Sequence, residues 1–167
     1  GTATNPVFAE PDINPFGIGS SLGGYIALTF VDIDVDGDLD LFIQVDRDLY
    51  GGFGGMDFLR NIGTASNPLF YLDTPTRFGI LEDSGSFESE SVTFADIDGD
   101  HDMDAFVGSQ FYQNSGTAVN LPDFSTYVGD FGINDETLTW SPAPAFVDID
   151  GDGDMDAFIG LGYDGYD

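Results

Sequence analysis

The sequence predicts an all-β protein built from three tandem repeats. Short segments rich in Phe, Val and Ile stand on either side of acidic turns, as strands do in hairpins. With 23 Gly and 8 Pro in 167 residues, the chain is interrupted too often for long helices. A hydrophobic content of 41% is enough for a folded domain with its own core.

Three landmarks recur in the same order along the chain. Each repeat begins with Gly-Thr-Ala, continues to a Phe-Gly-Ile, and then reaches a nine-residue aspartate ladder with Asp at every second position. The first repeat is longer because DRDLYGGFGGMDF, whose Gly-Gly-Phe-Gly-Gly is typical of a loop, follows its ladder. The landmarks define repeats 1–62, 63–115 and 116–167, with ladders that begin at Asp32, Asp96 and Asp148.

Apolar segments flank each ladder and are expected to be strands. In the segment after the first ladder, Leu41 and Ile43 point to one face while Phe42 points to the other, and the other repeats match this pattern. Both faces are apolar, which indicates a sheet stacked between two neighbouring sheets. The expected strands are 25–33, 91–97 and 143–149 before the ladders and 39–45, 103–108 and 155–160 after them.

The charge of the chain excludes several classes of partner. Its 31 acidic and 3 basic residues give a net charge of −28, so no basic groove for nucleic acid can form. No apolar run approaches the roughly 20 residues of a membrane-spanning helix, so we expect no membrane insertion. Without cysteine there is no disulfide framework, thiolate metal site or cysteine nucleophile.

The ladders predict calcium sites. They hold 15 of the 31 acidic residues in three short turns. Two carboxylates ~5 Å apart repel by about 3 kcal/mol at an effective dielectric constant of ~20, so a converging loop needs a cation. Oxygen ligands alone favour a hard divalent ion, and a cage made mainly by protein favours Ca²⁺ over Mg²⁺. We therefore expect about three Ca²⁺, one in each repeat.

An EF-hand is the obvious alternative, because its loop also opens with D-x-D-x-D-G. Its twelfth position should be a bidentate Glu within a helix. The twelfth positions here are Ile43, Val107 and Ile159, all in expected strands. The ladder is therefore predicted to join two strands rather than two helices.

The ladder residues have distinct expected roles. The seventh position is expected to offer its backbone carbonyl, with its side chain left in water; these residues are Asp38, Asp102 and Asp154. Side-chain ligands are expected from the first, third, fifth and ninth positions: Asp32, Asp34, Asp36, Asp40; Asp96, Asp98, Asp100, Asp104; Asp148, Asp150, Asp152, Asp156.

Two ladder positions depart from glycine in one repeat, and the sixth predicts a positive φ. At the sixth position Gly37 and Gly153 suit this conformation, whereas the second repeat has His101, which we interpret as a strained loop residue rather than a catalytic base. At the fourth position Val35 replaces the glycine of the other two repeats. We expect the first and second sites to bind calcium more weakly than the third.

The motifs FxDIDGDGDxDAFIG and xxNxGTAxNPxF resemble the FG-GAP and VCBS-type repeats related to the β-propeller of integrin α chains. The resemblance implies that each repeat is a four-stranded blade, that its ladder binds Ca²⁺ between two strands, and that the protein is extracellular or at the cell surface. It implies adhesion, ligand binding or scaffolding rather than catalysis. The matching segments are Phe94–Gly108, Phe146–Gly160, the more diverged Phe30–Val45, and the joints Asn61–Phe70 and Asn114–Phe124.

Three blades are fewer than the 4 to 8 of closed propellers, so we expect an array that is open or completed by neighbouring chains. The chain ends where the next Gly-Thr-Ala would begin; alternatively, GLGYDGYD parallels the insert of the first repeat and the last strand comes from another chain. Both interpretations leave an open edge that invites another copy to stack or donate a strand.

The sequence suggests three functions, of which the first is favoured. The first is a non-enzymatic, calcium-stabilised structural or adhesion module, including the protomer of a linear surface assembly or filament, whose partners are other copies or adjacent repeats. The second is a lectin-like or protein-binding propeller for glycans or surface proteins, which would use exposed Tyr and Trp and Asp acceptors in loops such as DRDLYGGFGG and GYDGYD. Taken alone, Trp140 is interpreted as a packing residue rather than a sugar-stacking platform. The third, a glycoside hydrolase with two carboxylates, is disfavoured because no carboxylate is singled out by the sequence.

Overall fold

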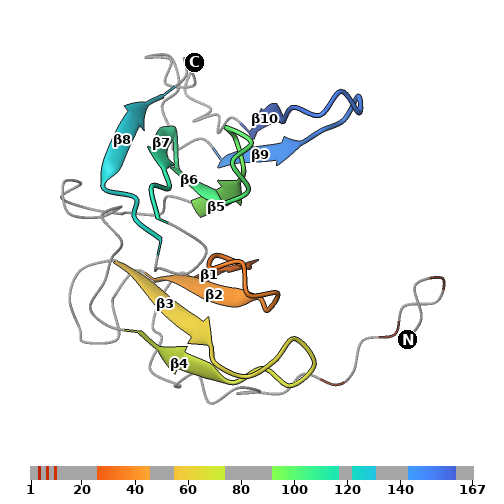
Figure 1. The fold of residues 1–167 in the computed structure, drawn as a ribbon, viewed down its shortest axis with the longest axis vertical. Helices are drawn as coiled ribbons and strands as arrows, with labels where there is room; N and C mark the ends of the chain where they lie inside the picture. Colours follow the sequence, from red (N-terminus) through yellow and green to blue (C-terminus); the bar gives the residue numbers. More distant parts are fainter. Residues whose placement is uncertain are drawn as a thin grey trace, which may run out of the picture.

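The computed structural model describes residues 26–45, 55–73, 92–116, 122–130 and 143–160, together with the isolated positions 4, 7 and 10. These residues form ten strands in three antiparallel sheets, and they include no helix (Figure 1). The described part of the chain accordingly contains no helix that could cross a membrane. The predicted all-β class is therefore confirmed, whereas the described strands form no closed barrel.

The first and second sheets each contain four strands in sequence order, and the third contains two. Each predicted pair of strands around a ladder is present as an antiparallel hairpin. The first sheet consists of β1 (Ile26–Val31), β2 (Asp40–Val45), β3 (Gly55–Asn61) and β4 (Phe70–Leu72). The second consists of β5 (Val92–Ala95), β6 (Asp104–Val107), β7 (Gln110–Gln113) and β8 (Thr126–Gly129), and the third of β9 (Ala143–Val147) and β10 (Asp156–Gly160).

The sheets are offset from the sequence repeats. The fourth strand of the first sheet, β4, lies after Gly63 and so comes from the second repeat. In the same way β8 lies after Gly116 and comes from the third repeat. Each four-stranded sheet is therefore completed by the beginning of the following repeat.

The sheets stack through their first strands, with β5 between β1 and β9 (Figure 1). The Thr29 Oγ1 on β1 donates to the Val92 carbonyl oxygen on β5 at 3.3 Å. The equivalent Thr93 Oγ1 donates to the Pro144 carbonyl oxygen on β9 at 2.9 Å. Two successive contacts between sheets therefore use the same hydrogen bond at equivalent positions.

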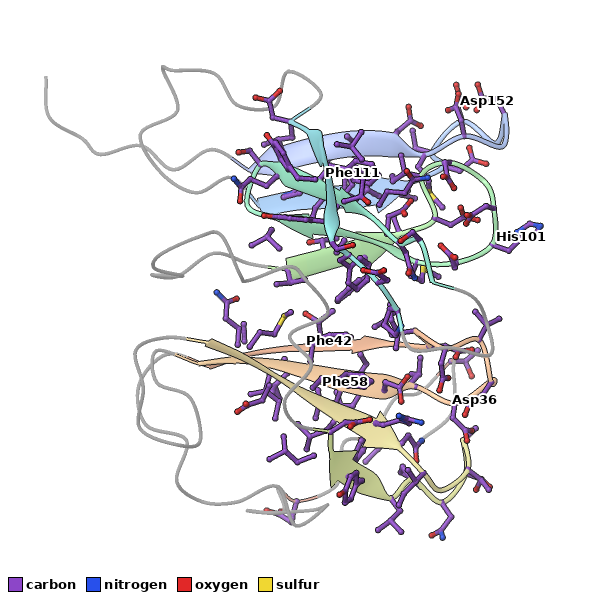
Figure 2. All side chains as sticks on the ribbon, turned by 60° about the vertical axis from the view of Figure 1, so that its left-hand side comes forward. Asp36, Phe42, Phe58, His101, Phe111 and Asp152 are labelled. Atoms are coloured by element: carbon purple, nitrogen blue, oxygen red, sulfur yellow. The ribbon has the colours of Figure 1, made fainter. Side chains whose placement is uncertain are left out.

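Phenylalanine pairs fill both of these contacts. Phe42 of the first sheet stacks on Phe94 of the second with 4.6 Å between ring centroids. Phe106 of the second sheet stacks on Phe146 of the third at 4.4 Å. Phe42 also lies 4.8 Å from Phe58 on the neighbouring strand β3 (Figure 2). The first and second sheets share one buried apolar cluster, and the pair of Phe106 and Phe146 extends the aromatic packing to the third sheet.

The predicted two-sided burial of the strands after the ladders is present in β2 and β6 but not in β10, where Phe158 is 49% exposed. In the first sheet, Phe42 belongs to the cluster shared with the second sheet. On the opposite face, Leu41, Ile43 and Leu59 form a separate buried cluster. Period-2 alternation thus sends apolar side chains to both faces, and both are buried.

Candidate metal centres

The three ladders form the loops of the hairpins β1–β2, β5–β6 and β9–β10. Figure 2 shows one labelled residue of each loop, Asp36, His101 and Asp152, along the same edge of the stacked sheets. The ladders therefore connect strands, as the sequence predicted in preference to the two helices of an EF-hand.

The first aspartate of each ladder closes its own loop. The Asp32 carboxylate accepts hydrogen bonds from the backbone N–H groups of Asp36 at 3.1 Å and Gly37 at 3.0 Å. Such carboxylate-to-backbone bonds form a compact turn from local sequence alone. In the other loops Asp96 accepts from Gly99 and His101, and Asp148 accepts from Gly151, Asp152 and Gly153.

The ninth aspartate ties the loop to the sheet. Asp104 is fully buried, and its two oxygens accept from the backbone N–H of Asn114 at 2.9 Å and of Ile97 at 3.0 Å. Asp40 is likewise buried and accepts from Asn61 at 2.7 Å and from Ile33. In the third loop the half-buried Asp156 accepts from Ile149 at 3.1 Å.

Three carboxylates converge in each loop, with one oxygen from each lying within 4.8 Å of the others. All of the grouped residues were predicted as ligands, but the structure groups the first, third and fifth positions in the first loop and the first, third and ninth in the other two. The seventh-position residues belong to none of these groups. The groups are Asp32, Asp34 and Asp36; Asp96, Asp98 and Asp104; and Asp148, Asp150 and Asp156.

Two buried carboxylate oxygens in the ladders lack a hydrogen-bond donor, which suits the binding of a cation. Among the described residues, the Oδ1 atoms of Asp34 and Asp102 are buried and accept no hydrogen bond. A buried carboxylate oxygen without a donor is costly unless a cation compensates it. The half-buried Asp38 and Asp102 also differ from the expectation that seventh-position side chains stay in water, whereas Asp154 is exposed as expected.

The pKa values of several ladder carboxyl groups are raised, which also favours a bound cation. Burial raises the pKa of Asp40 to about 6. Burial, together with a hydrogen bond to the Asp100 side chain, raises the pKa of Asp102 to about 7. Burial also raises the pKa of Asp104 and of Asp34, the latter with the Asp36 charge nearby. Each raised pKa reports a carboxylate whose negative charge is poorly compensated, which a divalent oxygen-binding cation would correct.

The positive φ predicted at the sixth ladder position is present, and the fourth position has one as well. His101 has φ 76° where Gly37 and Gly153 have 93° and 97°. At the fourth position Val35 has φ 57°, where the other loops have glycine at 77° and 78°. The His101 side chain is 93% exposed, consistent with a loop residue rather than a catalytic base. The first and second loops therefore carry backbone strain that the third does not.

Sequence reasoning missed the role of two asparagines. The Oδ1 of Asn114 accepts from the backbone N–H groups of Gly116 and Asp123, while its own backbone N–H binds Asp104. Asn61 makes the matching bonds to Gly63 and Leu69. The asparagine thus links the ninth ladder aspartate to the turn that starts the next repeat. The sequence feature that could have revealed this role is the repeated position of the asparagine, two residues before Gly63 and Gly116.

The Gly-Thr-Ala landmark has a steric reason at Gly63. A Cβ there would lie 2.4 Å from the Asn67 carbonyl oxygen, so only glycine fits the turn. Several predicted features lie outside the described residues: the three Phe-Gly-Ile landmarks, Trp140, GYDGYD and all of DRDLYGGFGG except its last residue, Gly55. No family model, curated protein or solved structure gives a significant match to this chain.

Proposed function

We propose that this chain is a non-enzymatic, calcium-stabilised repeat module of an extracellular or cell-surface protein, with a structural or adhesive role. The observation that carries the proposal is the convergence of three carboxylates at the same place in each of the three repeated hairpins. The resemblance to FG-GAP and VCBS-type repeats supports the extracellular setting.

The chemistry of the loops favours calcium. The grouped donors are carboxylate oxygens, which suit hard divalent cations. Ca²⁺ accepts 6 to 8 oxygens in adaptable geometry, so a flexible loop and solvent can complete its shell. Mg²⁺ demands near-octahedral geometry and keeps its water, which makes a protein cage of this kind a poorer match.

The proposed role of the ion is to hold each hairpin closed. The three loops lie along one edge of the stacked sheets, and repulsion between their carboxylates opposes folding (Figure 2). Calcium bound to the folded chain but not to the unfolded one would stabilise the fold by mass action.

Isothermal titration calorimetry with CaCl₂, followed by MgCl₂ as a comparison, tests the proposal. We expect three Ca²⁺ per chain and much weaker binding of Mg²⁺. Single changes of the third ladder residue, Asp34→Asn, Asp98→Asn and Asp150→Asn, should each remove one site, because an amide keeps the shape but loses the charge.

The matched control is Glu10→Gln, which removes one exposed carboxylate outside the ladders and should leave three sites. No calcium binding by the wild-type chain would overturn the proposal. Equal weakening by Glu10→Gln and the ladder variants would show diffuse counterion attraction instead of defined sites.

A further inference from the structure

The two internal contacts between sheets are made by equivalent residues. In each, the phenylalanine ten residues after the start of a ladder stacks on the phenylalanine two residues before the start of the next ladder: Phe42 on Phe94, and Phe106 on Phe146. The first ring of each pair is almost completely buried: Phe42 is 1% exposed and Phe106 is 2% exposed.

The third sheet carries the same residues, and no other sheet among the described residues covers them. Its trailing face, which we define as Val147, Ile149 and Phe158, repeats the Val, Ile and Phe of the first sheet's contact face. The first-sheet counterparts Val31, Ile33 and Phe42 are buried in the shared core. On the trailing face the exposed fractions are 44%, 66% and 49%.

The first sheet presents the complementary half. Its leading face, defined as Leu28, Phe30 and Leu39, has exposed fractions of 57%, 48% and 54%. Phe30 occupies the position of Phe94 and Phe146, the rings that receive a phenylalanine in the internal contacts. The leading face thus has the receiving residue and no described sheet against it.

An apolar pocket lies on the leading face. It has a volume of about 230 Å³ and is lined by Phe30, Leu39 and Phe70, with Gly37, Asn61, Ala65 and Pro68 at its sides. Phe30 and Phe70 lie 6.2 Å apart, and their counterparts Phe94 and Phe124 in the second sheet lie 6.1 Å apart. In the second sheet that site is part of the core that contains Val31, Ile33 and Phe42.

We propose that the trailing face of one copy docks on the leading face of a second copy, with Phe158 stacked on Phe30 in continuation of the two internal contacts. Exposed apolar patches of this kind mark interaction sites. A second copy is the occupant because its trailing face has the same Val, Ile and Phe that fill the equivalent site inside the chain. The contact is heterologous, so copies associate head to tail in a ring or a filament. This inference names the partner within the proposed structural role and rests on it.

The proposed contact between copies lacks one hydrogen bond that both internal contacts contain. The donating threonine, Thr29 or Thr93, is replaced by Ala145 in the third sheet. The matching acceptor on the second copy is the Leu28 carbonyl oxygen. Ala145→Thr should therefore restore the hydrogen bond and tighten association roughly two- to tenfold.

Sedimentation velocity in millimolar CaCl₂, at chain concentrations up to about 1 mM, tests the proposal. The wild-type chain should associate in a concentration-dependent way. Phe158→Asp, which blocks the trailing face, and Phe30→Asp, which blocks the leading face, should each be monomeric alone. An equimolar mixture of the two should form a one-to-one dimer through the remaining intact faces. The control Val128→Asp changes a similarly exposed apolar residue on β8 and should associate like the wild type.

Two results would overturn the proposal. A wild-type chain that stays monomeric throughout would show that these faces meet a different partner. Loss of association in Phe158→Asp but not in Phe30→Asp would show a symmetric contact between trailing faces. Calorimetry with CaCl₂ on the same samples separates the two hypotheses: monomers that still bind three Ca²⁺ reject only head-to-tail docking, whereas absence of calcium binding rejects the proposed function.

Discussion

The second and third ladders differ in sequence at one position, His101 against Gly153, yet their ninth aspartates lie in different surroundings. Asp104 is fully buried and accepts from two backbone N–H groups. Asp156 is half-buried, and its one hydrogen bond among the described residues comes from Ile149 within its own loop. The ladder alone therefore closes a loop, whereas the buried carboxylate of Asp104 also accepts a hydrogen bond from Asn114, just after the neighbouring strand β7.

Removal of calcium should lower the stability of the chain more than any single substitution in these loops. If each of three sites is near saturation at 100 times its dissociation constant, binding contributes about 8 kcal/mol in total. Excess chelator should then lower the melting temperature by about 20 °C, measured by circular dichroism. A melting temperature that is unchanged by chelator, and also by Mg²⁺ in its place, would contradict a stabilising role for the ion.

Loss of the ninth aspartate should distinguish the two loops. Asp104→Ala leaves two buried N–H groups without an acceptor and should cost about 3 kcal/mol of unfolding free energy. Asp156→Ala at the half-buried position should cost about 1 kcal/mol. Urea denaturation in chelator measures both without the contribution of the ion. Equal losses would show that burial of the ninth carboxylate adds nothing.

Removal of the linking asparagine should affect the second sheet without changing its ladder. Asn114→Ala leaves the backbone N–H groups of Gly116 and Asp123 unpaired and should cost about 2 kcal/mol. The exposed Asn67→Ala is the control, with an expected change within about 0.5 kcal/mol. Urea denaturation again provides the measurement, and similar values for the two variants would remove the asparagine from the account.

Exchange of the sixth ladder residue should give the smallest effect, with opposite signs in the two loops. His101→Gly relieves a positive φ and should stabilise the chain by about 1 kcal/mol, whereas Gly153→His should destabilise it by a similar amount. His101→Ala is the control, because alanine keeps the strain and should give no gain. A gain from both His101 variants would assign the effect to the lost side chain rather than to the backbone.

Much of the fold was predictable because its signals are local. Period-2 alternation placed Leu41 and Phe42 on opposite faces, and the apolar twelfth ladder position, Ile43 in the first repeat, placed the loops between strands. The positive φ of His101 followed from alignment with Gly37 and Gly153 in the other repeats. The calcium ligands themselves stay a prediction.

The rest depends on contacts between segments that local patterns do not report. The pairing of β4 with β3 joins the second repeat to the first sheet, and its register depends on both strands together. The bond from Asn61 to Asp40 spans 21 residues in the first repeat, against 10 for the equivalent bond in the second. The insert in the first repeat changes that separation, so fixed spacing could not reveal the pair.

The offset between sheets and repeats has a consequence for how such a chain grows, both on the ribosome and in evolution. A newly synthesised first repeat cannot complete its sheet until β4 of the second repeat has emerged. Duplication of one repeat-length stretch of gene would nevertheless preserve every sheet, because each added repeat supplies the closing strand of its predecessor and borrows one from its successor. The stretch of sequence that is duplicated therefore does not coincide with the sheet that folds. Because of this offset, the first two repeats each need a strand from the following repeat to complete their sheet.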